Sequence, residues 1–306
     1  AFDTLRDLGS ALSRAMEKMQ IEALIQIFTN FAIFALGFIL LYFKAEAKSL
    51  AFAYAIGSGL GFLAMVFTLK GHFKNLVKNF RAKLIGPIFK PAWPFGLLGL
   101  LGVIMLNTDI IMLGWLRSAT EVGYYAVAQK IIQLLYVFPT LLSVSVFPIM
   151  TRLAKTNPDY VKRVLEKSLA LVTLISIPIT LIGILFGGQI INILFGAEYG
   201  ASVIAFKILM LSVLIVYPGG LLGHAIFAYD EQKNFIAYVL IAAATNVILN
   251  ILLIPKFGIE GAAVATIFTQ LITNILIWRK IKAITKLSIR LEIKNYLLTL
   301  KNWNLF

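Results

Sequence analysis

The most prominent residues able to do chemistry form a run of polar side chains between Gly123 and Met150. Consecutive members are three or four residues apart, a spacing that puts them on one face of a helix. The rest of this stretch is almost wholly apolar, so we expect the polar face to line an aqueous cavity. The alternative is that these groups join neighbouring helices by hydrogen bonds, although Gln and Tyr are bulky for a tight interface. The members are Tyr125, Gln129, Gln133, Tyr136, Thr140 and Ser143.

Two charged residues could act together with this polar face. Lys130 lies about 100° around the helix from Gln129, where it could hold a phosphate if it faces the cavity. Its alternative is to snorkel, with its ammonium at an aqueous interface. Asp109 lies in an apolar stretch and needs a partner such as Lys130, or must bind a proton or Na⁺. Asp109 is therefore the ion-coupling candidate, with a structural salt bridge or a helix cap as the alternative.

Two further pairs of polar residues have a spacing of four, Asn246 with Asn250 and Gln270 with Asn274. Each pair would share one helical face. Interhelical hydrogen bonding explains each pair alone, but together they favour a polar-lined interior, so all four residues are cavity candidates.

A candidate hinge lies in a later apolar stretch, where Pro218 is followed by Gly219 and Gly220. Proline removes a backbone donor and the glycines loosen the helix, so we expect a kink or break there. Interrupted helices of this kind often mark the sites or hinges of transporters.

Several arrangements that a catalyst would need are missing from the sequence. There is no phosphate-binding loop followed by Lys-Ser/Thr, no acidic cluster able to hold Mg²⁺, and no cysteine. The two histidines, His72 and His224, make a His-based metal or catalytic site improbable. We therefore expect no enzyme, no metal site and no cofactor, and coupling to H⁺ or Na⁺ is the only role foreseen for an ion.

The composition indicates the elements that must position these residues. Of the 306 residues 60% are hydrophobic and 14% are charged, against about 25% charged in soluble domains. About eight apolar runs approach or exceed the ~20 residues that cross a bilayer as a helix, and they lack the alternation of a membrane barrel. The fold expected is all-α and integral to the membrane. The runs are 21–43, 49–69, 92–116, 123–150, 169–186, 201–228, 235–254 and 261–278.

The distribution of positive charge predicts the orientation. The formal net charge is +14, which in a soluble domain would suggest nucleic acid. Here most of the 28 Lys and Arg residues fall on the side that holds both chain ends, whereas the opposite loops hold only Lys44, Lys48, Arg117 and Lys256. Because cytoplasmic loops are enriched in Lys and Arg, we expect a multi-pass protein of the cytoplasmic membrane with both ends in the cytoplasm and no nucleic-acid partner.

A set of short motifs resembles a known family in order and spacing. The motifs are RAMEKM at 14–19, KPAWPFG at 90–96, NTD at 107–109, LG at 113–114, EVGYYAVA at 121–128, FP at 147–148, LFGAEY at 194–199 and PKFGIEGAA at 255–263. They resemble the polysaccharide-biosynthesis flippases, the Wzx-type members of the MATE-like multidrug/oligosaccharidyl-lipid/polysaccharide (MOP) exporter superfamily.

The resemblance implies two lobes of six helices that work by alternating access, with this chain as an N-terminally truncated fragment. It would hold one MATE-like lobe of six helices and two helices of the other lobe. The implied segments are a cytoplasmic amphipathic segment (1–20), the last two spans of an incomplete N-lobe (21–69), a basic cytoplasmic linker between the lobes (70–91), a six-span C-lobe (92–278) and a basic cytoplasmic tail (279–306).

The same resemblance implies a function. The family moves a lipid-linked oligosaccharide on a polyprenyl-pyrophosphate carrier across the cytoplasmic membrane. The expected partners are that substrate and membrane lipids, with polysaccharide polymerase and glycosyltransferases beside it. Such a substrate needs a polar, partly cationic cavity, so the cavity candidates named above, including Lys130, are the candidates for lining the substrate cavity. One alternative is a multidrug or other cation-coupled exporter of the same superfamily. Alternatives from other classes are an integral-membrane glycosyl- or phosphotransferase and a non-transporting scaffold, in which the polar face of 123–150 would pack against protein.

Overall fold

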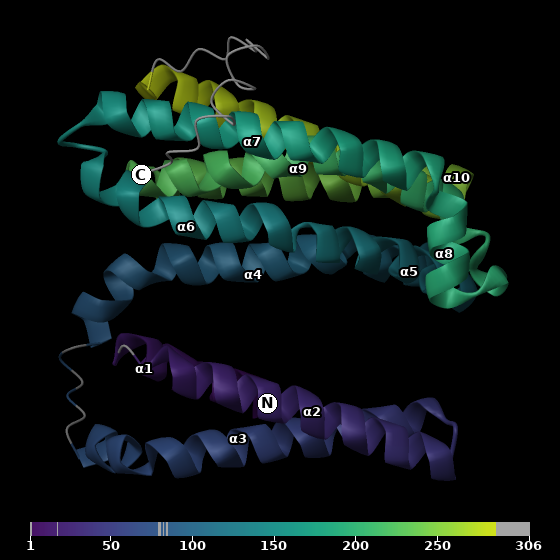
Figure 1. Ribbon diagram of the computed structural model, residues 1–306, viewed down its shortest axis with the longest axis horizontal. Coiled ribbons are helices and arrows are strands. Elements are labelled where there is room, and N and C mark those ends of the chain that lie inside the picture. Colours follow the sequence, from purple (N-terminus) through teal and green to yellow (C-terminus); the bar gives the residue numbers. More distant parts are fainter. Residues whose placement is uncertain (1, 17, 79–80, 82, 84, 286–306) are drawn as a thin grey trace. The chain divides into compact units, whose positions relative to one another are not determined.

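The computed structural model describes residues 2–16, 18–78, 81, 83 and 85–285, and the elements assigned within these ranges are helical. Figure 1 shows long helices that run side by side within each part of the chain. The predicted tail lies outside the described residues from 286 onward. The elements are α1 (Phe2–Ala15), α2 (Met19–Phe43), α3 (Ala47–Lys78), α4 (Ile85–Leu116), α5 (Ala119–Leu135), α6 (Val137–Leu153), α7 (Pro158–Leu185), α8 (Gly187–Phe195), η2 (Ala197–Tyr199), α9 (Ser202–Ala228) and α10 (Gln232–Thr285).

Seven helical stretches among the described residues are long and apolar enough to cross a membrane. Large apolar side chains remain exposed along them, such as Phe34 (71%), Leu134 (72%) and Trp115 (81%). Exposure of this kind is expected where lipid, not water, is the solvent. The prediction of an all-α, multi-pass membrane protein is confirmed.

The seventh stretch, α10, doubles back on itself at Gly258. As one straight helix its 54 residues would be about 80 Å long, against a hydrocarbon core of about 30 Å. Gly258 has a non-helical backbone (φ 56°, ψ −132°), and a Cβ on Gly261 would lie 2.5 Å from the carbonyl oxygen of Leu253. In a straight helix that carbonyl would be about 12 Å away along the axis. The two arms of α10 agree with the predicted spans 235–254 and 261–278, so the described residues make eight crossings.

The predicted fourth span is interrupted, unlike the single helix expected for 123–150. α5 ends at Leu135 and α6 begins at Val137. Pro139 supplies no backbone N–H, so it leaves the carbonyl of Leu135 without its helical donor, and the hydroxyl of Tyr217 donates to that carbonyl at 3.1 Å. The break therefore coincides with Pro139, and a hydrogen bond from α9 satisfies the carbonyl that this proline leaves without a donor.

The break expected at Pro218, Gly219 and Gly220 is absent, because α9 is helical from Ser202 to Ala228. A Cβ on Gly219 would lie 1.6 Å from Oδ1 of Asn274. This glycine therefore has a packing role, allowing α9 to approach the second arm of α10 closely. A hinge motion at these three residues stays a prediction.

The chain divides into two compact units, Ala1–Ile88 and Phe89–Phe306. In the first unit α2 and α3 cross through small residues: a Cβ on Gly57 would lie 2.9 Å from the backbone of Ile33, and one on Gly61 would lie 2.0 Å from Oγ1 of Thr29. Spaced small residues of this kind let membrane helices approach each other closely.

The helix α1 packs lengthwise on α3 instead of lying apart from the membrane helices. The carboxylate of Asp3 accepts hydrogen bonds from Tyr54 (2.7 Å) and Ser58 (3.1 Å), and Gly9 packs against Met65. All three α3 residues belong to the membrane-crossing stretch Ala47–Gly71. α1 therefore contacts the part of α3 that is long and apolar enough to cross a membrane. The cytoplasmic position expected for the amphipathic segment 1–20 stays a prediction.

The second unit is organised around α9, which packs against α5, α6, α7 and α10. Figure 1 shows α9 lying between α7 and α6, with α8 turned away from the axis of α7. The unit contains six of the eight crossings (α4, α5 with α6, α7, α9 and the two arms of α10), and the first unit contains the other two (α2 and α3). The numbers of crossings in the two units, six and two, agree with the fold class that the sequence predicts.

Candidate functional site

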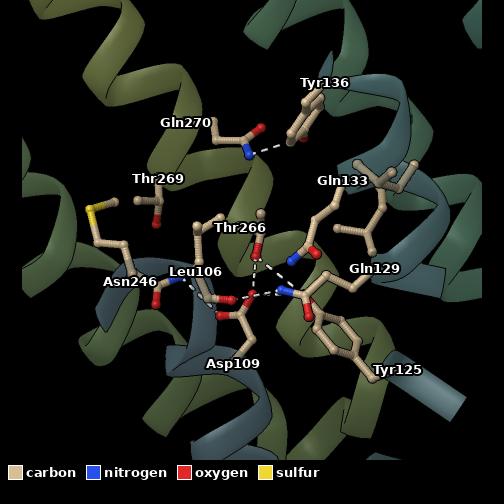
Figure 2. Close-up of a pocket in the computed structure, with 13 residues that line it drawn as sticks. Leu106, Asp109, Tyr125, Gln129, Gln133, Tyr136, Asn246, Thr266, Thr269 and Gln270 are labelled. Atoms are coloured by element: carbon tan, nitrogen blue, oxygen red, sulfur yellow. Dashed lines mark hydrogen bonds between the residues drawn. The ribbon is translucent and has the colours of Figure 1, made fainter. Parts of the chain in front are cut away.

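The carboxylate of Asp109 lies at the centre of a buried polar cluster in the second unit (Figure 2). Asp109 is 3% exposed. Its Oδ2 accepts hydrogen bonds from the hydroxyls of Tyr125 (2.6 Å) and Thr266. Its Oδ1 accepts from the amides of Asn246 (3.1 Å) and Asn250 (2.7 Å). Four neutral donors therefore surround one carboxylate, and we call these four residues the donor shell of Asp109.

The fold brings the donor shell together from three helical segments: α5 and the two arms of α10. Tyr125 lies one to two turns into α5, and Asn246 and Asn250 lie one turn apart on the first arm of α10. Thr266 lies on the second arm, which returns to the same depth because α10 turns back at Gly258. Each donor follows the helical period of its own element, but only the turn makes them converge.

No Lys or Arg among the described residues forms an ion pair with Asp109. The proposed partner Lys130 has an exposed side chain and does not line the cavity described below. An ionised carboxylate buried without a counter-charge is unfavourable unless hydrogen bonds or a cation stabilise it. The donor shell supplies the hydrogen bonds, and the site as a whole can accept one positive charge, either a proton or a metal cation.

A cavity of about 120 Å³ adjoins this carboxylate. Figure 2 shows the polar groups of α5 and of both arms of α10 pointing toward it. The volume is below the ~300 Å³ at which sites for drug-sized ligands begin, so the cavity suits water and a small ion. The lining residues are Met105, Leu106, Asp109, Tyr125, Gln129, Ile132, Gln133, Tyr136, Leu209, Asn246, Thr266, Thr269 and Gln270.

The polar residues around the cavity also hold the helices together. The Gln129 amide donates to the carbonyl of Leu106 at 2.9 Å and so connects α5 to α4. The Tyr136 hydroxyl is 2.6 Å from that of Ser212 on α9 and accepts a 3.3 Å hydrogen bond from the Gln270 amide. Cavity lining and interhelical bonding, which the sequence presents as alternatives, therefore occur in the same side chains.

The structure brings most of the sequence-predicted site residues to this cavity but not all of them. Lys130 and Thr140 are exposed and are not among the lining residues. Asn250 belongs to the donor shell without lining the cavity, and Asn274 donates to the carbonyl of Gln270 beside α9. The residues brought to the cavity are Asp109, Tyr125, Gln129, Gln133, Tyr136, Asn246 and Gln270.

The sequence analysis does not single out Thr266, one of the four donors, as a candidate site residue. Its signal is the spacing of four that puts it on the face of Gln270. Nothing local to the sequence distinguishes that spacing from an ordinary interhelical contact, because Thr is common at helix interfaces in membranes.

Comparison with known proteins agrees with the resemblance. Residues 3–204 match the family model described as "Polysaccharide biosynthesis protein". The chain is 35% identical over 172 residues to the probable flippase AglR of Haloferax volcanii, covering 55% of this chain and 36% of that protein. It is 22% identical over 264 residues to a putative O-antigen transporter of Shigella flexneri, covering 85% of this chain and 62% of that protein.

A solved structure shares the fold. The lipid II flippase MurJ, in an inward closed conformation, superposes on the whole of this chain with a TM-score of 0.75 at 20% identity, and the match spans 67% of the MurJ chain. The chain thus covers 36% and 62% of the lengths of the two relatives named above. With the family model matching residues 3–204, the chain belongs to the polysaccharide biosynthesis protein family.

Proposed function

We propose that this protein is part of a flippase that moves lipid-linked oligosaccharide units on a polyprenyl-pyrophosphate carrier across the cytoplasmic membrane by alternating access. The observation that carries the proposal is the family match over residues 3–204. The names of relatives, a probable flippase and a putative O-antigen transporter, support the same class of substrate. Transport of such a molecule needs no covalent step, so we infer that the protein is not an enzyme.

The size of the Asp109 cavity supports a role other than holding the saccharide. At about 120 Å³ it falls below the ~300 Å³ of the smallest usual ligand pockets. We infer that the oligosaccharide passes elsewhere and that Asp109 belongs to the coupling machinery of the same transporter.

The donor shell supports coupling to a cation. Asp109 offers two carboxylate oxygens, and the hydroxyl oxygens of Tyr125 and Thr266 lie within hydrogen-bonding distance of one of them. Oxygen ligands are those that hard cations prefer, and the buried Oδ1 of Asn250 has no hydrogen-bond partner. A Na⁺ ion or a proton on Asp109 would neutralise the buried charge and weaken its hold on the four donors, which link α4 to α5 and α10.

The orientation and partners follow from the same proposal. The excess of Lys and Arg on one side supports a cytoplasmic position for both ends of the chain. The substrate is made by glycosyltransferases on the cytoplasmic face and is consumed by a polysaccharide polymerase on the other. We therefore infer that these enzymes and the membrane lipids are the protein's neighbours, with no nucleic acid involved.

The test is transfer of a fluorescent lipid-linked saccharide between leaflets of liposomes that contain the protein, with and without a Na⁺ or a pH gradient. We expect transfer that a cation gradient accelerates, and we expect Asp109→Asn to remove the dependence on the gradient. The matched control is Lys130→Gln, which changes an exposed charge on α5 and should leave the dependence intact.

Each result of this test bears on one part of the proposal. Absence of saccharide transfer would refute the flippase function, and transfer of a cationic drug in its place would favour the multidrug exporter. Normal gradient dependence in Asp109→Asn would refute the coupling role while leaving the flippase function in place.

A further inference from the structure

The end of α4 is joined to the turn of α10 by the side chain of Arg117. Arg117 follows directly on Leu116, the last residue of α4. Its Nε donates to the carbonyl oxygen of Ile254 at 3.2 Å and lies 3.5 Å from a carboxylate oxygen of Glu121. The side chains of Arg117 and Glu121 are each 32% exposed, so this contact is more enclosed than an ordinary surface ion pair.

The acceptor of this hydrogen bond is a carbonyl that benefits from a charged donor. Ile254 lies four residues before Gly258, where the backbone leaves the helical region, so its carbonyl is one of the last four of the first arm. The carbonyl end of a helix carries partial negative charge, which a cation stabilises. Arg117 therefore caps the first arm of α10 from a different helix.

The third member of this contact is Glu121 on α5, whose carboxylate lies against the turn of α10 at Gly258. A Cβ on Gly258 would lie 2.8 Å from Oε2 of Glu121 and 3.1 Å from an Nη of Arg117. The backbone of the turn thus packs directly against the ion pair, and the positive φ of Gly258 suits glycine in particular. We call Arg117, Glu121 and Gly258 the outer clamp.

The outer clamp repeats the link made by Asp109 at a second level. Arg117 is eight residues beyond Asp109 on α4, and Ile254 is eight residues beyond Asn246 on α10, about 12 Å along each helix. No described residue of α4 before Thr108 is buried, and the hydrogen bonds described above that join α4 to its unit lie at Leu106, Asp109 and the adjoining Arg117. Two links at different levels fix both the distance and the register of two helices, whereas one link fixes neither fully.

We propose that Arg117 is a positioning residue that sets the register of α4 against the first arm of α10 and thereby holds Asn246 and Asn250 against Asp109. This role rests on the proposed coupling function of Asp109 only for its effect on cation dependence; the effect on helix register is independent of it. Glu121 orients the guanidinium, and Gly258 gives it room.

The experiment uses the absence of cysteine from the sequence, which makes introduced cysteines unique labelling sites. Ile111→Cys on α4 and Leu252→Cys on α10, both on exposed side chains, carry nitroxide labels whose separation is measured by pulsed EPR in liposomes. The Na⁺ concentration for half-maximal saccharide transfer is measured on the same variants without the labels.

Arg117→Gln should broaden the distance distribution and raise the half-maximal Na⁺ concentration about tenfold, equivalent to the loss of about 1.4 kcal/mol, since hydrogen bonds to charged groups contribute about this much. Arg117→Lys should restore part of both effects, because an ammonium can still donate to the carbonyl. The matched control is Lys256→Gln, which removes an exposed positive charge beside the same turn and should change neither.

An unchanged distance distribution in Arg117→Gln would overturn the positioning role. A broadened distribution with unchanged Na⁺ dependence would show that the clamp sets register without affecting the Asp109 site, which also overturns the proposal as stated. If the unmodified protein shows no cation dependence, the coupling function fails, and the distance measurement still decides whether Arg117 sets the register.

Discussion

Replacing Tyr125 by Phe removes one oxygen atom from the centre of the second unit and leaves the aromatic ring in place. The Tyr125 side chain is fully buried, and its hydroxyl donates to Oδ2 of Asp109 at 2.6 Å. Because Phe retains the ring and its packing, any loss of stability reports the hydrogen bond and not a cavity.

The magnitude depends on the charge of the acceptor. A hydrogen bond to an ionised carboxylate contributes about 1.5–3 kcal/mol, and one between neutral groups about 0.5–1.5 kcal/mol. Tyr125→Phe should therefore lower the free energy of unfolding by about 1.5–3 kcal/mol if Asp109 is ionised. In an Asp109→Asn background the same change should cost about 1 kcal/mol less.

The assay is a double-mutant cycle measured by equilibrium unfolding in mixed micelles, repeated with and without Na⁺. A cation or proton on Asp109 should reduce the coupling between the two residues, because the acceptor is then neutralised. The control is Tyr124→Phe, which removes the hydroxyl of a half-buried tyrosine that stacks edge-on with Tyr199 and should change stability by less than about 0.5 kcal/mol.

A coupling energy between Tyr125 and Asp109 that is indistinguishable from zero in every condition would contradict this prediction. The hydrogen bond from Tyr125 would then be equally strong to Asp109 and to the asparagine of Asp109→Asn, so it would not depend on a charge at this position. A loss of stability in Tyr124→Phe as large as that in Tyr125→Phe would instead show that any buried hydroxyl in this region has the same effect.

Two further predictions concern packing and pH. Gly219→Ala should destabilise the protein by about 1–3 kcal/mol through overpacking, because the added Cβ would overlap the Oδ1 atom of Asn274. Adding Asn274→Ala to this variant should restore much of the lost stability, measured by thermal unfolding. If stability is not restored, overpacking against Asn274 is not the cause of the loss. The hydrogen bond from Lys280 lowers the pKa of Glu231, and their charged groups are 2.9 Å apart. A lowered pKa in the folded state contributes stability above the ordinary pKa of Glu that is lost as the pH falls below about 4.3. Glu231→Gln should therefore flatten the decline of thermal stability in acid, and an unchanged pH profile would refute the contribution of this pair.

Much of the fold could be predicted because membrane crossing is a local property of composition. A run of about 20 apolar residues is sufficient for a helix that crosses a bilayer, so seven of the eight crossings needed no tertiary information. The fourth crossing is the exception, since Pro139 interrupts it between α5 and α6. That proline is visible in the sequence, but Pro218 is equally visible and leaves α9 unbroken. The two prolines differ in their surroundings. Near Pro139, the hydroxyl of Tyr217 donates a hydrogen bond to the carbonyl of Leu135.

The candidate site was only partly predictable for a related reason. Helical periodicity put Tyr125, Gln129, Gln133 and Tyr136 on one face, and all four line the cavity. The same periodicity could not decide the orientation of Lys130, whose side chain is exposed, because a long cationic side chain near a helix end can turn either way.

The membrane class, the approximate positions of the crossings and the polar face of α5 follow from the sequence alone, since each depends on residues within a few turns of one another. The neutral donors around Asp109, in contrast, are brought together by tertiary packing. Its partners Asn246, Asn250 and Thr266 are 137, 141 and 157 residues away along the chain. They meet because α10 turns back at Gly258 and returns its second arm to the depth of the first. Such a meeting depends on how whole helices pack, which the 3.6-residue period of any one helix does not specify.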